Sequence, residues 1–215
     1  MRVLKIPVGP FEVNCYIVVD EQNAECFLID PGDEPQKIIE LIENQKLKPQ
    51  KIINTHSHID HVRHLLQVKE HFNIPFFIHE DDLPLLEAMK EQALFFGLDC
   101  SDIPEVDGFL NDGDTFEMDS QLVRILHTPG HSPGSISIYF QKNVFVGDVL
   151  FKESIGRTDL YGGNYQVLMD SIKNKLLTLP DETVVHSGHG PETTIGNERR
   201  QNPFLKDLEK NGFRE

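Results

Sequence analysis

The first half of the chain alternates between short apolar runs and longer segments in which apolar residues recur every three or four positions. Runs of β-branched and aromatic residues predict strands, and the longer spacing predicts helices that pack by one face. The predicted strands are residues 14–20, 25–30, 51–54 and 75–79. The predicted helices are residues 35–45, 63–72 and 80–96. Residues 97–115 are rich in Gly, Asp and Pro and are expected to be irregular.

The second half of the chain repeats this order. Its predicted elements are strands at 122–127, 135–140, 143–146 and 183–186, a loop at 147–163, a helix at 165–177 and a C-terminal helix. This order predicts an α+β fold with two sheets facing each other and helices outside, a four-layer αββα sandwich. The chain has no internal repeat and no long Ser/Gly/Pro linker, which predicts a single domain over residues 1–215.

The composition is acidic, with 20 Lys+Arg against 35 Asp+Glu and a formal net charge of −15. This charge disfavours nucleic acid as a partner, because affinity for phosphates comes largely from Lys and Arg. No apolar run reaches 18 residues, and the N-terminus lacks the pattern of a secretory signal, so no membrane partner is expected. The 3 cysteines are far apart and outside any CxxC, as free thiols in a reducing compartment would be. We therefore expect a cytoplasmic protein.

Ten histidines are many for this length, and they cluster in the segment THSHIDH, residues 55–61. His56 and His58 can project to the same side only on extended chain, because on a helix they would lie about 200° apart. The cluster is therefore expected in the loop that leaves the strand before it. Asp60 and His61 follow within a turn and can face a second centre nearby. Imidazole and carboxylate ligands at this spacing indicate a metal site that suits zinc, iron or manganese.

Three further candidate ligands follow predicted strands in the second half. His131 lies in TPGHSPG, His189 in SGHGP, and Asp148 directly after FVG. Glycine allows the backbone to approach a ligand closely, and proline fixes the turn. Each loop alone is a weak signal, but with the first cluster they supply five histidines and two aspartates. That number is too large for one tetrahedral ion and fits two ions about 3.5–4 Å apart.

The motifs THSHIDH, GHSPGS, GD at 147–148 and GHG, in this order along the whole chain, resemble the metal motifs of the metallo-β-lactamase fold. That family folds as an αββα sandwich, in agreement with the cruder reading of the pattern. The resemblance implies two divalent metal ions, with zinc as the first expectation and iron or manganese as alternatives. It assigns one ion to His56, His58 and His131, the other to Asp60, His61 and His189, and the bridging position to Asp148.

Within that superfamily the chain resembles the short bacterial branch of glyoxalase II-like hydrolases, also described as hydroxyacylglutathione hydrolase-like. The segments that carry this resemblance are DPG at 30–32, FKESIGRTD at 151–159, GHGPE at 188–192 and NERRQNP at 197–203. Two features depart from the branch. Arg63 and His64 replace the small residues that often follow the first motif, and only residues 192–215 follow Pro191, so the helical glutathione-binding domain of full-length glyoxalase II is expected to be missing.

The resemblance implies hydrolysis of a small-molecule thioester of the S-(hydroxyacyl)glutathione type. A hydroxide that bridges two metal ions would attack the carbonyl, since bound divalent ions lower the pKa of water towards about 7. Asp60 is expected both to bind metal and to orient the nucleophile. The thiolate leaves without a dedicated acid. Arg157 is the first candidate for contact with an anionic substrate, and Arg63 is the second.

The sequence leaves three alternative functions open. A mononuclear Fe(II) persulfide dioxygenase on the same fold would use His56 or its neighbour, His131 and Asp148 as a two-histidine, one-carboxylate site. The ligands alone allow this reading, but the complete second set favours the dinuclear hydrolase. A nuclease is disfavoured by the charge, and a purely structural metal module would need a closed coordination sphere. The other histidines are expected to pack or face solvent: His64, His71, His79, His127 and His186.

Overall fold

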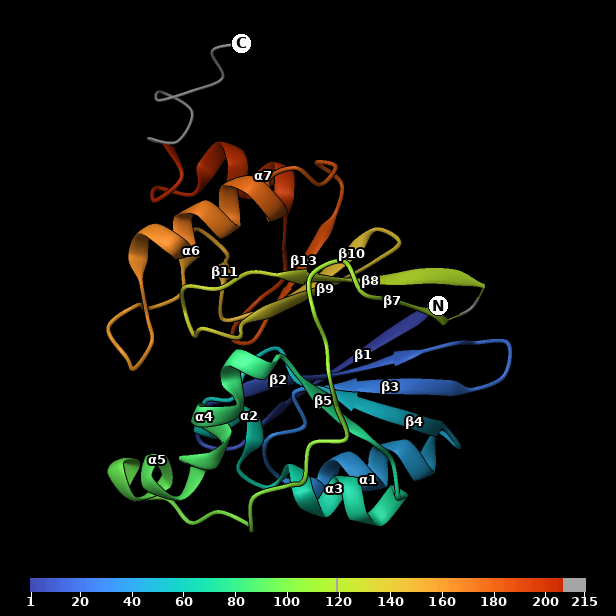
Figure 1. Ribbon diagram of the computed structural model, residues 1–215. Coiled ribbons are helices and arrows are strands. Elements are labelled where there is room, and N and C mark those ends of the chain that lie inside the picture. Colours follow the sequence, from blue (N-terminus) through green and yellow to red (C-terminus); the bar gives the residue numbers. More distant parts are fainter. Residues whose placement is uncertain (119, 207–215) are drawn as a thin grey trace.

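Two six-stranded sheets face each other between layers of helices in the computed structural model, which describes residues 1–118 and 120–206 (Figure 1). The predicted α+β fold with four αββα layers is therefore confirmed. The prediction of one domain over residues 1–215 includes residue 119 and residues 207–215, which lie outside the described residues.

The first sheet contains antiparallel strands at one edge and parallel strands at the other. Its strands, in spatial order, are β1 (Arg2–Val8), β2 (Val13–Val19), β3 (Glu25–Ile29), β4 (Lys48–Ile53), β5 (Phe76–Ile78) and β6 (Gly108–Phe109). β1, β2 and β3 pair antiparallel, whereas β3 to β6 pair in parallel. Parallel neighbours need crossover connections. These are α1 (Pro35–Asn44), α2 (Ile59–Val62), α3 (Leu65–Phe72), a 3₁₀ turn (Glu80–Asp82), α4 (Leu83–Glu87) and α5 (Met89–Phe96).

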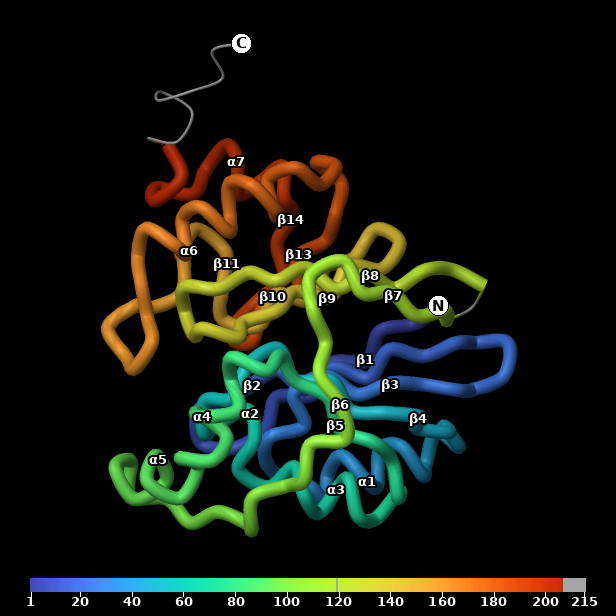
Figure 2. The backbone as a smooth tube through the Cα atoms, viewed as in Figure 1, coloured from blue at the N-terminus to red at the C-terminus, as the bar shows by residue number. Residues whose placement is uncertain are grey.

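The second sheet is mostly antiparallel, and the chain enters it between β6 and β7 (Figure 2). Its strands, in spatial order, are β14 (Thr193–Thr194), β13 (Val184–Ser187), β10 (Asn143–Gly147), β9 (Ile136–Phe140), β8 (Gln121–His127) and β7 (Thr115–Met118). β10 and β13 pair in parallel, and the crossover between them holds a small hairpin and a helix. Its parts are β11 (Leu150–Phe151), β12 (Ser154–Ile155), α6 (Tyr165–Ser171) and a π-helical turn (Ile172–Leu176). α7 (Ile195–Gln201) follows β14.

The central strands are apolar on both faces because each face is covered. On β2, Cys15 and Ile17 pack with the helices of the first layer, whereas Tyr16 and Val18 pack against the second sheet. Side chains alternate between the two faces of a strand, so a strand buried on both faces becomes one continuous apolar run. This explains why VNCYIVV is so readily predicted as a strand. Among the described residues, no helix has the length and apolar character needed to cross a bilayer.

Several local predictions differ from the structure, among them the loop expected at 147–163, which holds the hairpin of β11 and β12. The helix expected over residues 80–96 is broken into a 3₁₀ turn, α4 and α5, with the second break at Ala88, whose ψ of 15° departs from the helical value. The segment 97–115, expected to be irregular, contributes β6 and the first residue of β7. These short strands form by pairing with distant neighbours, which local sequence does not reveal.

The histidine cluster also differs in part from its expected loop conformation. His56 and His58 do lie in the loop after β4, but Asp60 and His61 belong to the single turn of α2. His58, in extended conformation, is the residue before that helix begins. The loop-to-helix change directs the first two imidazoles and the last two side chains toward different positions.

Candidate metal centre

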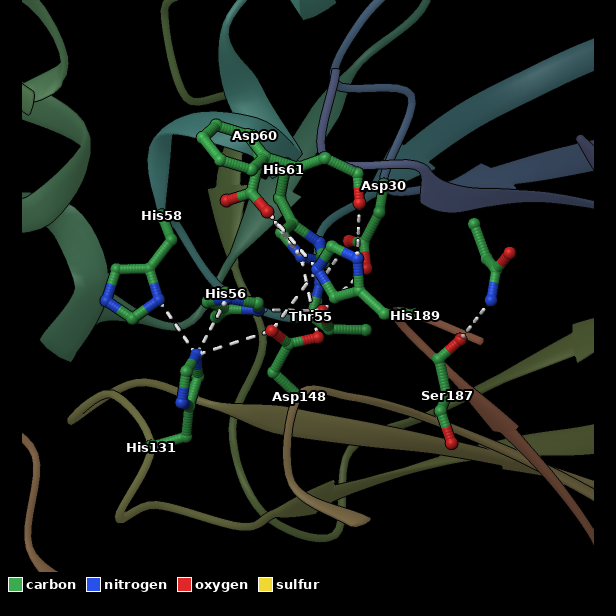
Figure 3. A network of polar contacts seen from close by, with 12 residues as sticks. Asp30, Thr55, His56, His58, Asp60, His61, His131, Asp148, Ser187 and His189 are labelled. Atoms are coloured by element: carbon green, nitrogen blue, oxygen red, sulfur yellow. Dashed lines mark hydrogen bonds and ion pairs between the residues drawn. The ribbon is translucent and has the colours of Figure 1, made fainter. Parts of the chain in front are cut away.

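Four loops converge where the two sheets meet, and each contributes side chains to one cluster (Figure 3). The loops follow β4, β8, β10 and β13, so all four leave the ends of strands. The structure brings together all seven residues predicted as ligands. Their potential ligand atoms form overlapping groups, each within 4.8 Å: His56, His58 and His131; Asp60, His61 and His189; and His56, His61 and Asp148.

The first group consists of three buried imidazoles whose ring nitrogens face one another. Nε2 of His131 lies 2.8 Å from Nδ1 of His58 and 3.2 Å from Nε2 of His56. Three neutral imidazoles have few protons to share among so many nitrogen lone pairs. The arrangement is therefore suited to a cation between them.

The second group mixes imidazoles with carboxylates. Nε2 of His189 lies 3.2 Å from Oδ2 of Asp60 and 3.4 Å from Oδ2 of Asp148. Nε2 of His61 lies 3.8 Å from Asp60 and 3.6 Å from Asp148. Asp148 also lies 3.8 Å from Nε2 of His131 in the first group. Asp148 thus contacts both groups, which is the position that a bridging ligand requires.

Backbone carbonyls set the proton positions of two imidazoles. Nδ1 of His131 donates to the carbonyl oxygen of Arg157 at 2.8 Å, and Nδ1 of His189 donates to that of Phe11 at 2.9 Å. A carbonyl oxygen can only accept, so the proton of each neutral ring stays on Nδ1. The lone pair of Nε2 then faces the cluster and is free to bind a metal.

Asp30 does the same for the rings of His61 and His56, the latter through Thr55. Its Oδ2 lies 3.0 Å from Nδ1 of His61 and accepts a hydrogen bond from the Thr55 hydroxyl at 2.6 Å. Because that hydroxyl donates to Asp30, it accepts from Nδ1 of His56, 3.1 Å away. Both rings therefore turn Nε2 inward. Sequence reasoning used DPG only as a family signature and missed this role, although a carboxylate directly after a buried strand was a usable signal.

Orphaned polar atoms test whether these residues suit a metal. Nε2 of His61 and Oδ1 of Asp148 are buried and have no hydrogen-bond partner in the structure. Buried polar atoms are rarely left unpaired in proteins, and unpaired ones indicate a missing ion or water. A donor set of imidazole nitrogens and carboxylate oxygens suits zinc, iron and manganese. The residues present fit divalent cations.

The carboxylates and burial act in opposite directions on the histidine pKa values. Burial lowers the pKa of His58 to about 3 and lowers that of His56 as well, with neighbouring imidazoles adding to the effect. Burial also lowers the pKa of His61 and His189, but nearby carboxylates outweigh it and raise these values to about 9 and about 11. In the metal-free protein, the protonated rings of His61 and His189 thus balance the negative charges of Asp60 and Asp148. A divalent ion that binds there would displace these protons.

Asp82 fastens two metal-site loops to each other, a role that the sequence did not reveal. Its carboxylate is completely buried and accepts from the backbone N–H of Ser57 at 2.8 Å and from the Ser132 hydroxyl at 2.9 Å. It also accepts from the backbone N–H of Gly134 at 2.6 Å. Ser57 separates His56 from His58 in the chain. The carboxylate therefore holds the histidine loop of the first sheet against the loop that carries His131.

The two candidate substrate residues lie in different surroundings. Arg157 lines the cavity above the cluster, and its Nε and Nη2 atoms each lie 2.8 Å from a carboxylate oxygen of Asp159. Arg63 lies 3.3 Å from Asp33 and 3.5 Å from Asp99 and is not among the residues that line the cavity. The structure therefore brings Arg157 to the site, already paired with a carboxylate, and leaves Arg63 outside.

Several other histidines take part in packing. The rings of His79 and His127 stack with centroids 3.9 Å apart, and Nε2 of His127 donates to the carbonyl of Pro133 at 2.9 Å. His186 is buried, and its Nε2 lies 2.9 Å from the side-chain oxygen of Asn143. The His79–His127 stack joins the two halves of the sandwich, whereas the contact of His186 lies within the second sheet. All three histidines lie outside the three overlapping ligand groups.

Comparison with known proteins places the chain in a family. Residues 8–189 match the model of the metallo-β-lactamase superfamily. The chain is 42% identical to a protein of Haemophilus influenzae described as hydroxyacylglutathione hydrolase GloC, over 95% of this chain and 98% of the relative.

Solved structures agree with the family match. The structure of the B3 metallo-β-lactamase BLEG-1 superposes with a TM-score of 0.89 at 39% identity, covering 95% of this chain and all (100%) of the other. The structure of TTHA1623, in a di-iron-bound form, gives a TM-score of 0.86 at 41% identity, covering 94% and 100%. These matches show that the chain belongs to the metallo-β-lactamase superfamily of metallo-hydrolases, in agreement with the groups of His and Asp described above.

Proposed function

We propose that this protein is a dinuclear metal-dependent hydrolase that cleaves thioesters of the S-(hydroxyacyl)glutathione type. The observation that carries the proposal is the pair of ligand groups joined by Asp148. Two-metal sites are typical of hydrolytic chemistry at neutral pH. The name of the Haemophilus influenzae relative supports the substrate class.

The chain's residues would hold the metals and guide the reaction. His56, His58 and His131 would hold one ion, Asp60, His61 and His189 the other, and Asp148 would contact both. When bound, the ions supply an activated water at neutral pH and electrostatic stabilisation of the developing oxyanion. Zinc is our first assignment, because imidazole and carboxylate ligands suit it. Iron is the alternative, supported by the di-iron form of TTHA1623.

Asp60 would act directly on the nucleophile. It is 18% exposed and lines the cavity, so its carboxylate reaches both the metal-ligand cluster and the space for substrate. There it orients the attacking water through a hydrogen bond and accepts its proton. The leaving thiolate is stable enough to depart unprotonated, since a thiol has a pKa near 8.5. Arg157, in the lining of the cavity, would contact a substrate carboxylate and would give up one of its two hydrogen bonds to Asp159.

The structure gives less support to a mononuclear iron dioxygenase. That reaction needs one two-histidine, one-carboxylate site. Here the second group, Asp60, His61 and His189, is complete and lies against the first, with Asp148 between them. A site for one ion would leave those residues without a role.

The expected surroundings follow from charge and cysteine chemistry. Cys15 and Cys26 are buried free thiols and Cys100 is a partly exposed one, which suits a reducing compartment such as the cytoplasm. The net charge of −15 favours a small-molecule substrate over nucleic acid.

The test combines metal analysis with a substrate panel. The purified protein should bind two divalent ions per chain and hydrolyse S-lactoylglutathione. Asp60→Asn should lower kcat by about 100-fold or more, as expected for loss of a general base. Asp102→Asn, the same change at a carboxylate that is 84% exposed, is the matched control and should leave kcat unchanged.

Three results would contradict the proposal. One is a metal-replete wild type that turns over no thioester. Another is hydrolysis of β-lactams alone. The third is one iron per chain together with oxygen uptake on glutathione persulfide.

A further inference from the structure

The cavity above the metal-ligand residues has an aromatic wall. Its volume is about 540 Å³, and besides the candidate ligands its lining includes Phe11, Phe95, Phe96 and Tyr161. The rings of Phe11 and Phe96 meet edge to face at 5.7 Å, and those of Phe95 and Phe96 at 5.0 Å. In Figure 1, α5 and the loop before α6 lie on the same side of the molecule, one from each half. The wall therefore spans both halves of the sandwich.

These rings are unusually exposed for aromatic side chains. Phe95 is 81% exposed and Tyr161 is 73% exposed. α5 already buries Met89 and Ala93 against the first layer, so Phe95 is not needed for packing. Single exposed apolar residues need no explanation, but a contiguous group at the mouth of a cavity indicates a binding surface.

The fixed charges in the cavity are few. Apart from the candidate metal ligands, the charged residues among its lining are Glu91 and Arg157. Arg157 is paired with Asp159 through two contacts of 2.8 Å. Arg157 is the one cation among these lining residues, and its pairing with Asp159 partly neutralises it; the proposed function already assigns it to a carboxylate of the substrate. The wall thus suits an uncharged, apolar part of a substrate better than an ionic one.

We propose that the substrates are thioesters whose acyl group carries an aromatic or other bulky apolar substituent. This inference rests on the proposed thioester hydrolysis and specifies the acyl half. Glutathione carries two carboxylates and an ammonium, which favour water over this wall. Its half of the substrate therefore extends outward, and the acyl half lies against Phe95 and Phe96. Burial of the substituent against these rings releases water from apolar surface on both sides.

The experiment keeps the thiol constant and changes one group. S-mandeloylglutathione and S-lactoylglutathione are both 2-hydroxyacyl thioesters and differ by a phenyl in place of a methyl. The metal-loaded wild type should show a kcat/KM at least tenfold higher for the mandeloyl thioester, mainly through a lower KM. Mandelate should also inhibit more strongly than lactate, which has the same hydroxyl and carboxylate.

Variants locate the preference on the wall. Phe95→Ala and Phe96→Ala should each lower the ratio of kcat/KM for the mandeloyl thioester to that for the lactoyl thioester at least threefold. Leu94→Ala is the matched control, because Leu94 is 81% exposed on the same helix but does not line the cavity. It should change neither value. Metal content and melting temperature verify that each variant is folded and loaded.

The outcomes separate this inference from the proposed function. Equal or faster hydrolysis of the lactoyl thioester overturns the aromatic preference and leaves thioester hydrolysis intact. A preference that survives both phenylalanine substitutions overturns the assignment to this wall. No turnover of either thioester overturns the proposed function and this inference with it.

Discussion

The carboxylate of Asp30 lies 3.0 Å from Nδ1 of His61, and both side chains are almost completely buried. Asp30 directly follows β3 and His61 lies in α2, so the two residues belong to different motifs and meet only in the folded protein. The contact keeps the His61 proton on Nδ1, so that Nε2 faces Asp60 and Asp148. The contact between Asp30 and His61 therefore leaves the Nε2 lone pair of His61 free to bind a metal.

Asp30→Asn should lower metal affinity by about 10–100-fold. The amide nitrogen of Asn would donate toward Nδ1 of His61 and favour the tautomer in which Nε2 carries the proton. A competition titration with a chromophoric chelator measures the change. Asp20→Asn, at a buried carboxylate at the end of β2, should leave affinity unchanged. Equal affinities for wild type and Asp30→Asn would show that Asp30 does not set the tautomer.

Asp82→Ala should destabilise the protein by about 3 kcal/mol or more, because it leaves the buried N–H groups of Ser57 and Gly134 without an acceptor and removes one partner of the Ser132 hydroxyl. It should also weaken metal binding, since the loops carrying His56 and His131 lose their common anchor. Denaturant unfolding and metal titration measure the two effects. Asp81→Ala removes the neighbouring carboxylate, which is 54% exposed, and should change the free energy of unfolding by less than about 0.5 kcal/mol. A similar small effect for both variants would refute the anchoring role.

Gly188→Ala should abolish binding at the second group while the chain still folds. A Cβ at Gly188 would overlap Oδ1 of Asp148 and lie 2.9 Å from Cε1 of His61. Gly190→Ala is the informative comparison, because a Cβ there has no neighbour within 4 Å but the backbone φ is +73°. Its cost should be about 1 kcal/mol of stability, with metal binding retained. Metal content after dialysis distinguishes the two variants, and full loading of Gly188→Ala would contradict the packing argument.

Phe145→Ala should lower the free energy of unfolding by about 3–5 kcal/mol. Phe145 is fully buried between the sheets, where its ring meets Tyr16 edge to face at 5.2 Å and stacks on His186 at 4.6 Å. Leu122→Ala, at a side chain that is 61% exposed on β8, should cost less than about 1 kcal/mol. Urea unfolding followed by circular dichroism gives both values. Comparable losses would mean that the layer between the sheets is not the main core.

Stability should decrease as the pH is lowered from about 6.5 to about 4, in part because of His186. Burial lowers the pKa of His186 to about 4, although Glu192 opposes the effect, whereas an unfolded histidine titrates near 6.5. Between these values the unfolded chain binds more protons, so the free energy of unfolding falls with pH, by up to about 3 kcal/mol from this group.

The measurement is the free energy of unfolding across this pH range. His186→Gln should show a flatter pH dependence than the wild type. His71→Gln changes a histidine that is 42% exposed and should keep the wild-type slope. Parallel curves for all three proteins would exclude His186 as a source of the pH dependence.

The sequence alone determined the layers and the residues available as ligands. Strands such as VNCYIVV are apolar at every position because both faces are covered, and this pattern is local and visible in one dimension. The spacing of THSHIDH likewise limits where its imidazoles can point, whatever the rest of the chain does. His131, Asp148 and His189 could also be identified, because each directly follows a predicted strand and this position is visible in the local sequence.

Tertiary structure decided which residues surround the candidate metal ligands. Asp82 and the aromatic wall carry no local signal, because their roles depend on contacts between segments far apart in the chain, as between Asp82 and Ser132. Arg157 shows a different limit: its partner Asp159 is close in the chain, but only the conformation of the loop decides that the two side chains pair. Ligand identity follows from side-chain chemistry, whereas proton positions, anchoring and cavity shape follow from distances that only folding sets.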